Sequence, residues 1–167
     1  AIPLVLGGDH SLAAGSVAAA AAWAGRTRDR PIGLLWVDAH GDMNTPATSV
    51  SGNVHGMPLA ALLGREPAEL ARIGGFSPKV LPAHTVLVGV RNLDEREKVL
   101  VRDSGVHVFT MKDIDRQGIA SIAEQVDFSA LSPLMPKIAS STVRTMSRST
   151  SDGEAPGYGI VTPITGC

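Results

Sequence analysis

The sequence predicts an α/β fold built around a parallel sheet. Short, continuously apolar runs, typical of strands buried on both faces, alternate with segments of helical character from Ile2 to Gln125. The first run, residues 2–6, is followed by an alanine-rich segment of high helix propensity and then by a second run at residues 32–37. A strand, a helix and a strand at this spacing form a unit with parallel strands and a right-handed crossover.

The remaining elements follow the same alternation. The first helix begins at Ser11, whose side chain can cap its first turn, and the polar residues 25–31 are expected to form a turn. After the second strand, a loop of small residues at 38–56 leads into a helical segment at 57–64. Further strands are expected at 85–90 and 106–110, a charged amphipathic segment at 94–103, and a helix at 115–125.

Composition and charge limit the class of protein. A chain of 167 residues with 44% apolar content can bury one core, and its net charge of -1 gives no reason to expect nucleic acid or an anionic membrane as a partner. No apolar run approaches the roughly 20 residues that span a bilayer. The single cysteine, Cys167, cannot close an internal disulfide, so we expect a cytoplasmic protein with a small-molecule substrate. Because the sequence starts at Ala1 with an apolar run, we interpret it as a fragment.

A row of polar side chains follows the second strand. In WVDAHGDMNT, Asp38, His40, Asp42 and Asn44 occupy every second position, so in an extended segment they project from one face. Such crowding of carboxylates is costly unless a cation lies between them or water surrounds them. The GGDHS segment after the first strand should bring His10 to the same sheet edge. Oxygen and imidazole ligands without thiolate suit Mn²⁺ or a related divalent ion.

Several of these groups also have an ordinary structural interpretation. A single D-x-H-x-D is often a solvated loop, and Asp9 with His10 could cap the following helix. The loop SGNVHG, residues 51–56, could hydrogen-bond a polar substrate and donate a proton, or be an ordinary polar loop. Asp94 and Glu97 lie at a predicted helix start, where spacing alone favours capping and dipole electrostatics over the binding of an ammonium group.

Three motifs together resemble a known family. GGDHS, WVDAHGDMNTPATSVSGNVHGMPLAALLG and LVGVRNLDEREK, in this order, are similar to the ureohydrolase superfamily and, within it, to the arginases. The resemblance implies a three-layer α/β/α fold with a mostly parallel central sheet. It also implies hydrolysis of L-arginine to L-ornithine and urea by a hydroxide that bridges two manganese ions, in an enzyme of arginine metabolism that forms trimers or hexamers.

The resemblance also implies roles for individual residues. Ligands of one manganese match His10, Asp38 and Asp42, His40 matches a ligand of the other ion, and Asp38 bridges the two. The proton shuttle matches His55. Groups around the substrate match Asn44, Ser51 and Asn53 on its α-carboxylate side, and Asp94 with Glu97 near its α-amino group. Asn92 stands where family members often carry an acidic residue.

The sequence departs from the family after about residue 128. Arginases carry a D-x-D pair on a later strand, whereas residues 128–153 contain a single acidic residue, Asp152, before a segment at 155–167 that resembles a later family turn. We therefore expect a core at 1–127, a divergent irregular segment at 128–154, and at most one tightly bound metal ion. Two alternatives stay open: a catalytically inactive ureohydrolase-like subunit, and another amidinohydrolase such as agmatinase, against which the SGNVHG loop argues.

Overall fold

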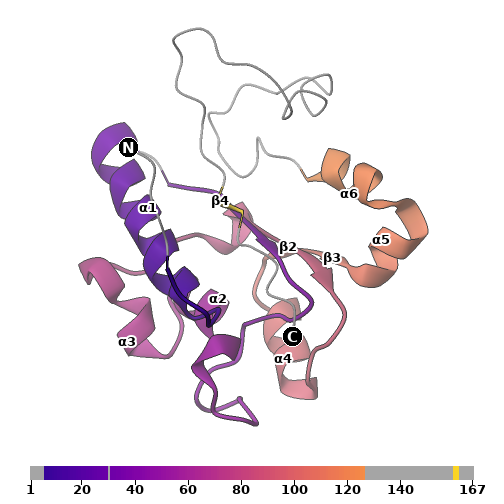
Figure 1. Ribbon diagram of the computed structural model, residues 1–167, viewed down its shortest axis with the longest axis horizontal. Coiled ribbons are helices and arrows are strands. Elements are labelled where there is room, and N and C mark those ends of the chain that lie inside the picture. The colour runs from indigo at the N-terminus through magenta and orange to yellow at the C-terminus, as the bar shows by residue number, and fades with distance from the viewer. Residues whose placement is uncertain (1–5, 30, 127–159, 162–167) are drawn as a thin grey trace, which may run out of the picture.

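A computed structural model of the protein describes residues 6–29, 31–126 and 160–161, and in these residues the predicted α/β organisation is confirmed (Figure 1). Its centre is a four-stranded sheet in the order β3-β2-β1-β4, in which all neighbouring pairs are parallel. The strands are β1 (Leu34–Val37), β2 (Thr85–Val90), β3 (His107–Thr110) and β4 (Ile160–Val161).

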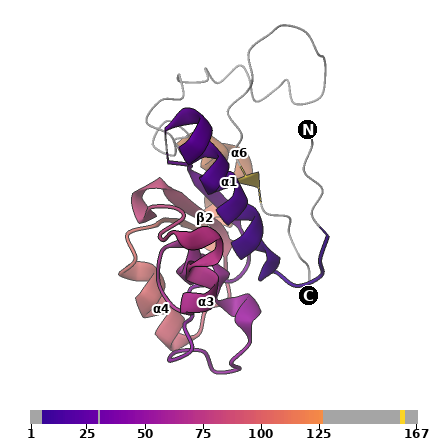
Figure 2. The same ribbon diagram turned by 90° about the vertical axis from the view of Figure 1, so that its left-hand side faces the viewer.

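Helices cover both faces of the sheet, which confirms the three-layer arrangement. Figure 2 shows α1 and α3 in front of the strands and α6 behind them. The helices on the first side are α1 (Leu12–Arg28), α2 (Pro58–Leu62), α3 (Ala68–Ala71) and α4 (Glu95–Arg102). Those on the second side are α5 (Met111–Gln117) and α6 (Ile119–Gln125), and the short 3-10 turns are η1 (Val54–Gly56), η2 (Ile73–Gly75) and η3 (Pro82–His84). In the described part of the chain, no helix is long and apolar enough to span a membrane.

Two hydrophobic clusters, one on each face of the sheet, explain why the strands are continuous apolar runs in the sequence. Successive side chains of a strand point to opposite faces, so both sets are buried when helices cover both sides. Leu34 and Trp36 pack in the larger cluster with residues of α1 and α2, whereas Val86 and Val88 pack with Ile122 of α6. The sheet is therefore held rigidly, and its carboxyl edge can carry a precisely shaped loop.

The prediction of a turn at residues 25–31 is wrong in its first half, because α1 continues to Arg28. Asp29 then adopts a left-handed conformation with φ of 51°, and Pro31 follows. A residue before proline is disfavoured in a helix, so the break falls here and not at Gly25. The strands agree more closely: the strand at 85–90 is confirmed, and the other two begin at Leu34 and His107, slightly later than expected.

The single helix predicted at residues 115–125 is two helices. A capping box between Thr110 and Asp113 starts α5 at Met111, earlier than expected. Gly118, with φ of 80°, separates α5 from α6 because this backbone conformation cannot continue a right-handed helix.

The predicted cap of the first helix is also wrong. Ser11 precedes α1 but has nearly helical dihedrals, φ -58° and ψ -21°, and its side chain accepts no hydrogen bond from the first turn. Instead the Asp9 carboxylate accepts from the Ser11 backbone N–H at 2.8 Å, which agrees with the capping interpretation of Asp9.

Two sequence predictions fall largely outside the described residues. Residues 2–5 of the first expected strand are not described, and Leu6 is exposed and belongs to no helix or strand. The irregular segment expected at 128–154 is likewise not described. β4 lies within the segment 155–167, for which no strand was predicted.

Candidate metal centre

The carboxyl ends of β1 and β2 are joined by backbone hydrogen bonds that fix the loop after β1. The Asp38 N–H donates to the Val88 carbonyl at 3.0 Å, and the Arg91 and Asn92 N–H groups donate to the Ala39 carbonyl at 2.9 and 3.0 Å. Further along, the Asp42 carbonyl accepts from the backbone of α2 at 3.0 Å. The polar residues after β1 are therefore held at the sheet edge, as the sequence predicted for parallel strands.

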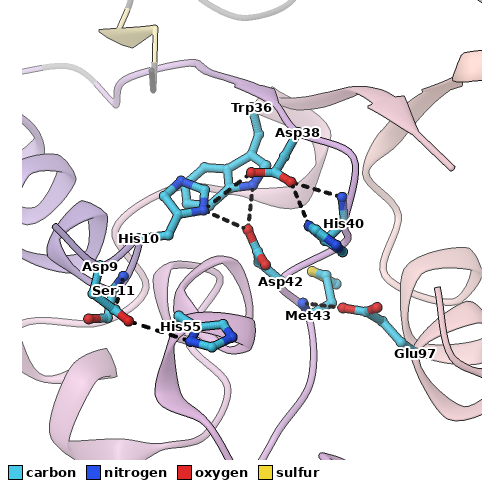
Figure 3. A network of polar contacts seen from close by, with 10 residues as sticks. All are labelled: Asp9, His10, Ser11, Trp36, Asp38, His40, Asp42, Met43, His55 and Glu97. Carbon is cyan, nitrogen blue, oxygen red and sulfur yellow. Dashed lines mark hydrogen bonds and ion pairs between the residues drawn. The ribbon is translucent and has the colours of Figure 1, made fainter. Parts of the chain in front are cut away.

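His10, Asp38 and Asp42 converge at this edge (Figure 3). The His10 Nδ1 atom lies 3.0 Å from Asp42 Oδ2 and 3.3 Å from Asp38 Oδ2. One ligand atom from each of the three residues lies within 4.8 Å of the other two, which is close enough to hold a single cation. Their side chains are 11%, 8% and 6% exposed, in the order His10, Asp38, Asp42, so water screens these groups only slightly.

His40 approaches the same carboxylate from another direction. Its Nδ1 atom lies 3.1 Å from Asp38 Oδ1, and its backbone N–H donates to that oxygen at 2.8 Å. The His40 side chain is 53% exposed. Asp38 thus presents one oxygen to His10 and the other to His40, an arrangement that could serve a cation on each side.

The row of polar residues after β1 is not extended, so that prediction is wrong. The chain bends at Ala39 and His40, and Asp42 has a left-handed φ of 50°, which aspartate tolerates better than most residues. Because the backbone turns between them, the Asp38 and Asp42 carboxylates both approach His10 from a bent loop and do not project from one face of a strand. Asn44 turns away from them and donates to Asp94 Oδ2 at 2.9 Å.

The electrostatics of the cluster favour a positive charge between the carboxylates. A hydrogen bond with Asp42 raises the pKa of His10, and burial opposes this shift. One Nδ1 proton cannot bond both nearby carboxylates fully, whereas a divalent ion can be bound by both at once. The donors are carboxylate oxygens and imidazole nitrogens, which suit Mn²⁺ and similar ions, so the described residues fit a metal of this class.

Asp94 has the capping role that spacing favoured. One of its oxygens accepts from the Arg96 and Glu97 backbone N–H groups at 3.0 and 2.8 Å, at the start of α4. The bond from the Glu97 N–H is the main cause that lowers the pKa of Asp94. Its other oxygen accepts from Asn44, whose own side-chain oxygen accepts from Thr48 at 2.9 Å. A contact of Asp94 with the substrate stays a prediction.

Glu97 has a structural partner that the sequence did not reveal. Its residue is 5% exposed, and Oε1 accepts from the Met43 backbone N–H at 3.0 Å. Burial raises the pKa of this carboxyl group. A Cβ atom at Gly41 would lie 2.8 Å from the same oxygen, so glycine is needed where the loop passes α4. The two partners are 54 positions apart in the chain, and no local pattern indicates such a contact.

The polar side chains of the SGNVHG loop lie at the surface. Ser51, Asn53 and His55 are all exposed, and Ser51 Oγ accepts from the Asn53 backbone N–H at 3.2 Å. His55 Nδ1 lies 3.4 Å from Asp9 Oδ2, and its side chain is 54% exposed. Figure 3 shows His55 linked to Asp9, the residue that precedes His10 in the chain, and the exposed imidazole is open to a ligand. The substrate and proton-transfer roles of these residues stay predictions.

Comparisons of sequence and of structure with known proteins both find arginases. A sequence profile described as the Arginase family matches residues 1–133. The arginase of Bacillus caldovelox is 52% identical over 123 residues, which are 74% of this chain and 40% of that relative. Its solved structure has a TM-score of 0.68 and 50% identity over 78% of this chain and 42% of that chain. Entamoeba histolytica arginase, solved in complex with L-ornithine, has a TM-score of 0.64 and 35% identity, covering 73% of this chain and 40% of that chain. This chain therefore spans about 40% of the length of the first of these relatives.

Proposed function

The chain belongs to the arginase family. We propose that its function is the manganese-dependent hydrolysis of L-arginine to L-ornithine and urea. The arginase relatives, including the Entamoeba histolytica enzyme solved with L-ornithine, support this substrate class. We further propose a cytoplasmic homo-oligomer, a trimer or hexamer, as the resemblance implies.

The position of Asp38 is the observation that carries the proposal. Its two carboxylate oxygens lie 3.3 Å from His10 Nδ1 and 3.1 Å from His40 Nδ1. A carboxylate with a separate imidazole at each oxygen is suited to bridge two divalent ions. Asp42 completes the set on the His10 side, where His10, Asp38 and Asp42 each offer a ligand atom within 4.8 Å of the others.

In this proposal the side chains of the chain have separate tasks. When bound, divalent ions supply the Lewis acidity that makes water a nucleophile near neutral pH, which attack on a guanidinium carbon requires. The residues that would hold these ions are His10, Asp38, His40 and Asp42. His55, exposed on its loop, donates a proton to the leaving amine, whose departure would otherwise be slow.

Polar side chains near the same sheet edge bind the substrate's α-carboxylate and α-amino groups in this proposal. Ser51 and Asn53 are exposed and can donate hydrogen bonds to a carboxylate. Asn44 is 9% exposed and already bonded on both sides, so its contribution is to hold Asp94 in place next to the substrate. Asp94 and Glu97 supply negative charge near the α-amino group.

We propose that this chain binds one ion tightly and the second weakly. Two divalent ions bring four positive charges, and Asp38 with Asp42 offers two negative ones. Residues 128–153 add only Asp152, with no D-x-D pair. Uncompensated repulsion between ions lowers the affinity of the second site. The same observation favours a second candidate, a ureohydrolase-like subunit without catalytic activity.

A urea assay with added Mn²⁺ separates the candidates. Wild-type chain is incubated with L-arginine, agmatine or guanidinobutyrate, beside Asp38→Asn and a control, Asp103→Asn, which alters an exposed carboxylate of an Arg102 pair. We expect urea from L-arginine alone, lost in Asp38→Asn and kept in Asp103→Asn. Urea from agmatine would indicate another amidinohydrolase. No urea from any substrate, from chain shown to bind Mn²⁺, would favour the inactive subunit.

A further inference from the structure

We propose that Trp36 is a positioning residue for the metal centre, which holds Asp42 and His10 in the orientation that a cation requires. The inference rests on the metal centre of the proposed function. Trp36 lies on β1, beneath the sheet edge, and is fully buried at 0% exposure. It contacts two of the three clustered side chains, one through its N–H group and one through its ring (Figure 3).

The N–H group fixes the Asp42 carboxylate. Trp36 Nε1 donates to Asp42 Oδ2 at 3.1 Å, and this is the oxygen that lies 3.0 Å from His10 Nδ1. An indole has a single donor and no acceptor, so this bond is its full hydrogen-bonding capacity. Because the acceptor is a buried carboxylate, the bond is charge-assisted and strongly directional. It therefore determines which way the carboxylate of Asp42 is turned.

The ring fixes His10. The two ring centroids are 4.7 Å apart and the planes are 28° from parallel. His10 lies in the turn before α1, and its Nε2 atom is buried without a hydrogen-bond partner among the described residues. Within the described part of the chain, its ring is therefore oriented by the stack on Trp36 and by the contacts of Nδ1 with the carboxylates. Stacking keeps Nδ1 directed toward Asp38 and Asp42.

A core-filling role alone does not explain this residue. A phenylalanine or leucine could fill an apolar position on β1 without burying a polar N–H group, which costs free energy unless it is bonded. Here the N–H group points at a candidate ligand and the ring covers another. Groups that orient metal ligands in this way typically affect metal affinity by about 10–100-fold.

The test uses the two tryptophans of the chain as matched sites. Trp36→Phe keeps an aromatic ring but removes the N–H donor, and Trp23→Phe makes the same change on α1, at a residue that is 42% exposed. Mn²⁺ affinity of the full chain is measured by calorimetry, and unfolding of the metal-free protein is measured in parallel. We expect Trp36→Phe to bind Mn²⁺ about 10–100-fold more weakly, and Trp23→Phe to bind it as the wild type does.

Tryptophan emission supplies a second measurement that does not need the Trp36 variant to fold. In Trp23→Phe, Trp36 is the sole tryptophan, and paramagnetic Mn²⁺ should quench its emission in proportion to binding. Equal Mn²⁺ affinity in the two variants would overturn the positioning role and leave the metal centre intact. Mn²⁺ binding without quenching of Trp36 would place the ion away from Asp42 and His10, which Trp36 contacts, and would overturn both the metal centre and the positioning role. Wild-type chain that binds no Mn²⁺ would overturn the proposed function and the positioning role together.

Discussion

Replacement of Glu97 tests the unexpected link between α4 and the ligand loop. Its Oε1 accepts from the Met43 N–H at 3.0 Å, and Met43 is fully buried. Glu97→Ala leaves this N–H group without a partner, which costs about 1–3 kcal/mol. Glu97→Gln keeps an uncharged acceptor of the same shape. We therefore expect the alanine variant to be less stable than the glutamine variant by about 1–3 kcal/mol.

Urea unfolding of metal-free protein, followed by circular dichroism, measures this difference. The same two changes at Glu95, whose side chain is 88% exposed on the first turn of α4, should differ by at most about 0.5 kcal/mol. Alanine and glutamine variants of equal stability at Glu97 would refute the link. Because the loop carries Asp42, Glu97→Ala should also weaken Mn²⁺ binding. If Glu97 contacts the substrate's α-amino group, Glu97→Gln should raise KM for L-arginine while Mn²⁺ affinity stays unchanged.

Three further predictions concern the same loop, a helix cap and the proton donor. Gly41→Ala places a Cβ atom 2.8 Å from a carboxylate oxygen and should destabilise the fold by about 1–3 kcal/mol in urea unfolding. The control Gly15→Ala, which has open space on α1, should stabilise the fold by about 0.5–1 kcal/mol. Equal effects of the two substitutions would contradict the close approach at Gly41. Hydrogen bonds from Thr110 lower the pKa of Asp113 in the folded protein. The ionised Asp113 carboxylate therefore stabilises the fold when the pH is above its ordinary pKa of 3.8, and this stabilisation is lost as the pH falls below that value. Asp113→Asn should therefore flatten the acid limb of the stability curve, and an unchanged limb would argue against the cap. His55→Ala should lower urea formation from L-arginine by about 10²–10⁴-fold with Mn²⁺ affinity unchanged; a matching loss of affinity would make His55 a ligand.

Strand positions could be predicted from the sequence because the sheet is buried on both faces. An apolar run such as residues 85–90 needs no knowledge of its partners to be identified, and the structure has it as β2 with the same bounds. Helix ends were predicted less well. The end of α1 depends on Asp29 before Pro31, and the break between α5 and α6 depends on Gly118, where single-residue conformations decide and average propensity does not.

The site shows the same division between topology and local geometry. The sequence predicted that His10 meets Asp38 and Asp42, and the three residues do lie together, although the strand expected before His10 lies outside the described residues. The bend at Asp42 could not be predicted, because it depends on a left-handed residue inside a loop. The contact between Glu97 and Met43 also depends on packing between distant segments.

Calorimetric titration of the full chain with Mn²⁺ decides whether the sheet-edge cluster is a metal centre. We expect one tightly bound ion per chain, with binding lost in both His10→Ala and Asp42→Asn while both variants remain folded. A chain that binds no Mn²⁺, or whose binding is unchanged by these two substitutions, would show that the cluster is not a metal centre.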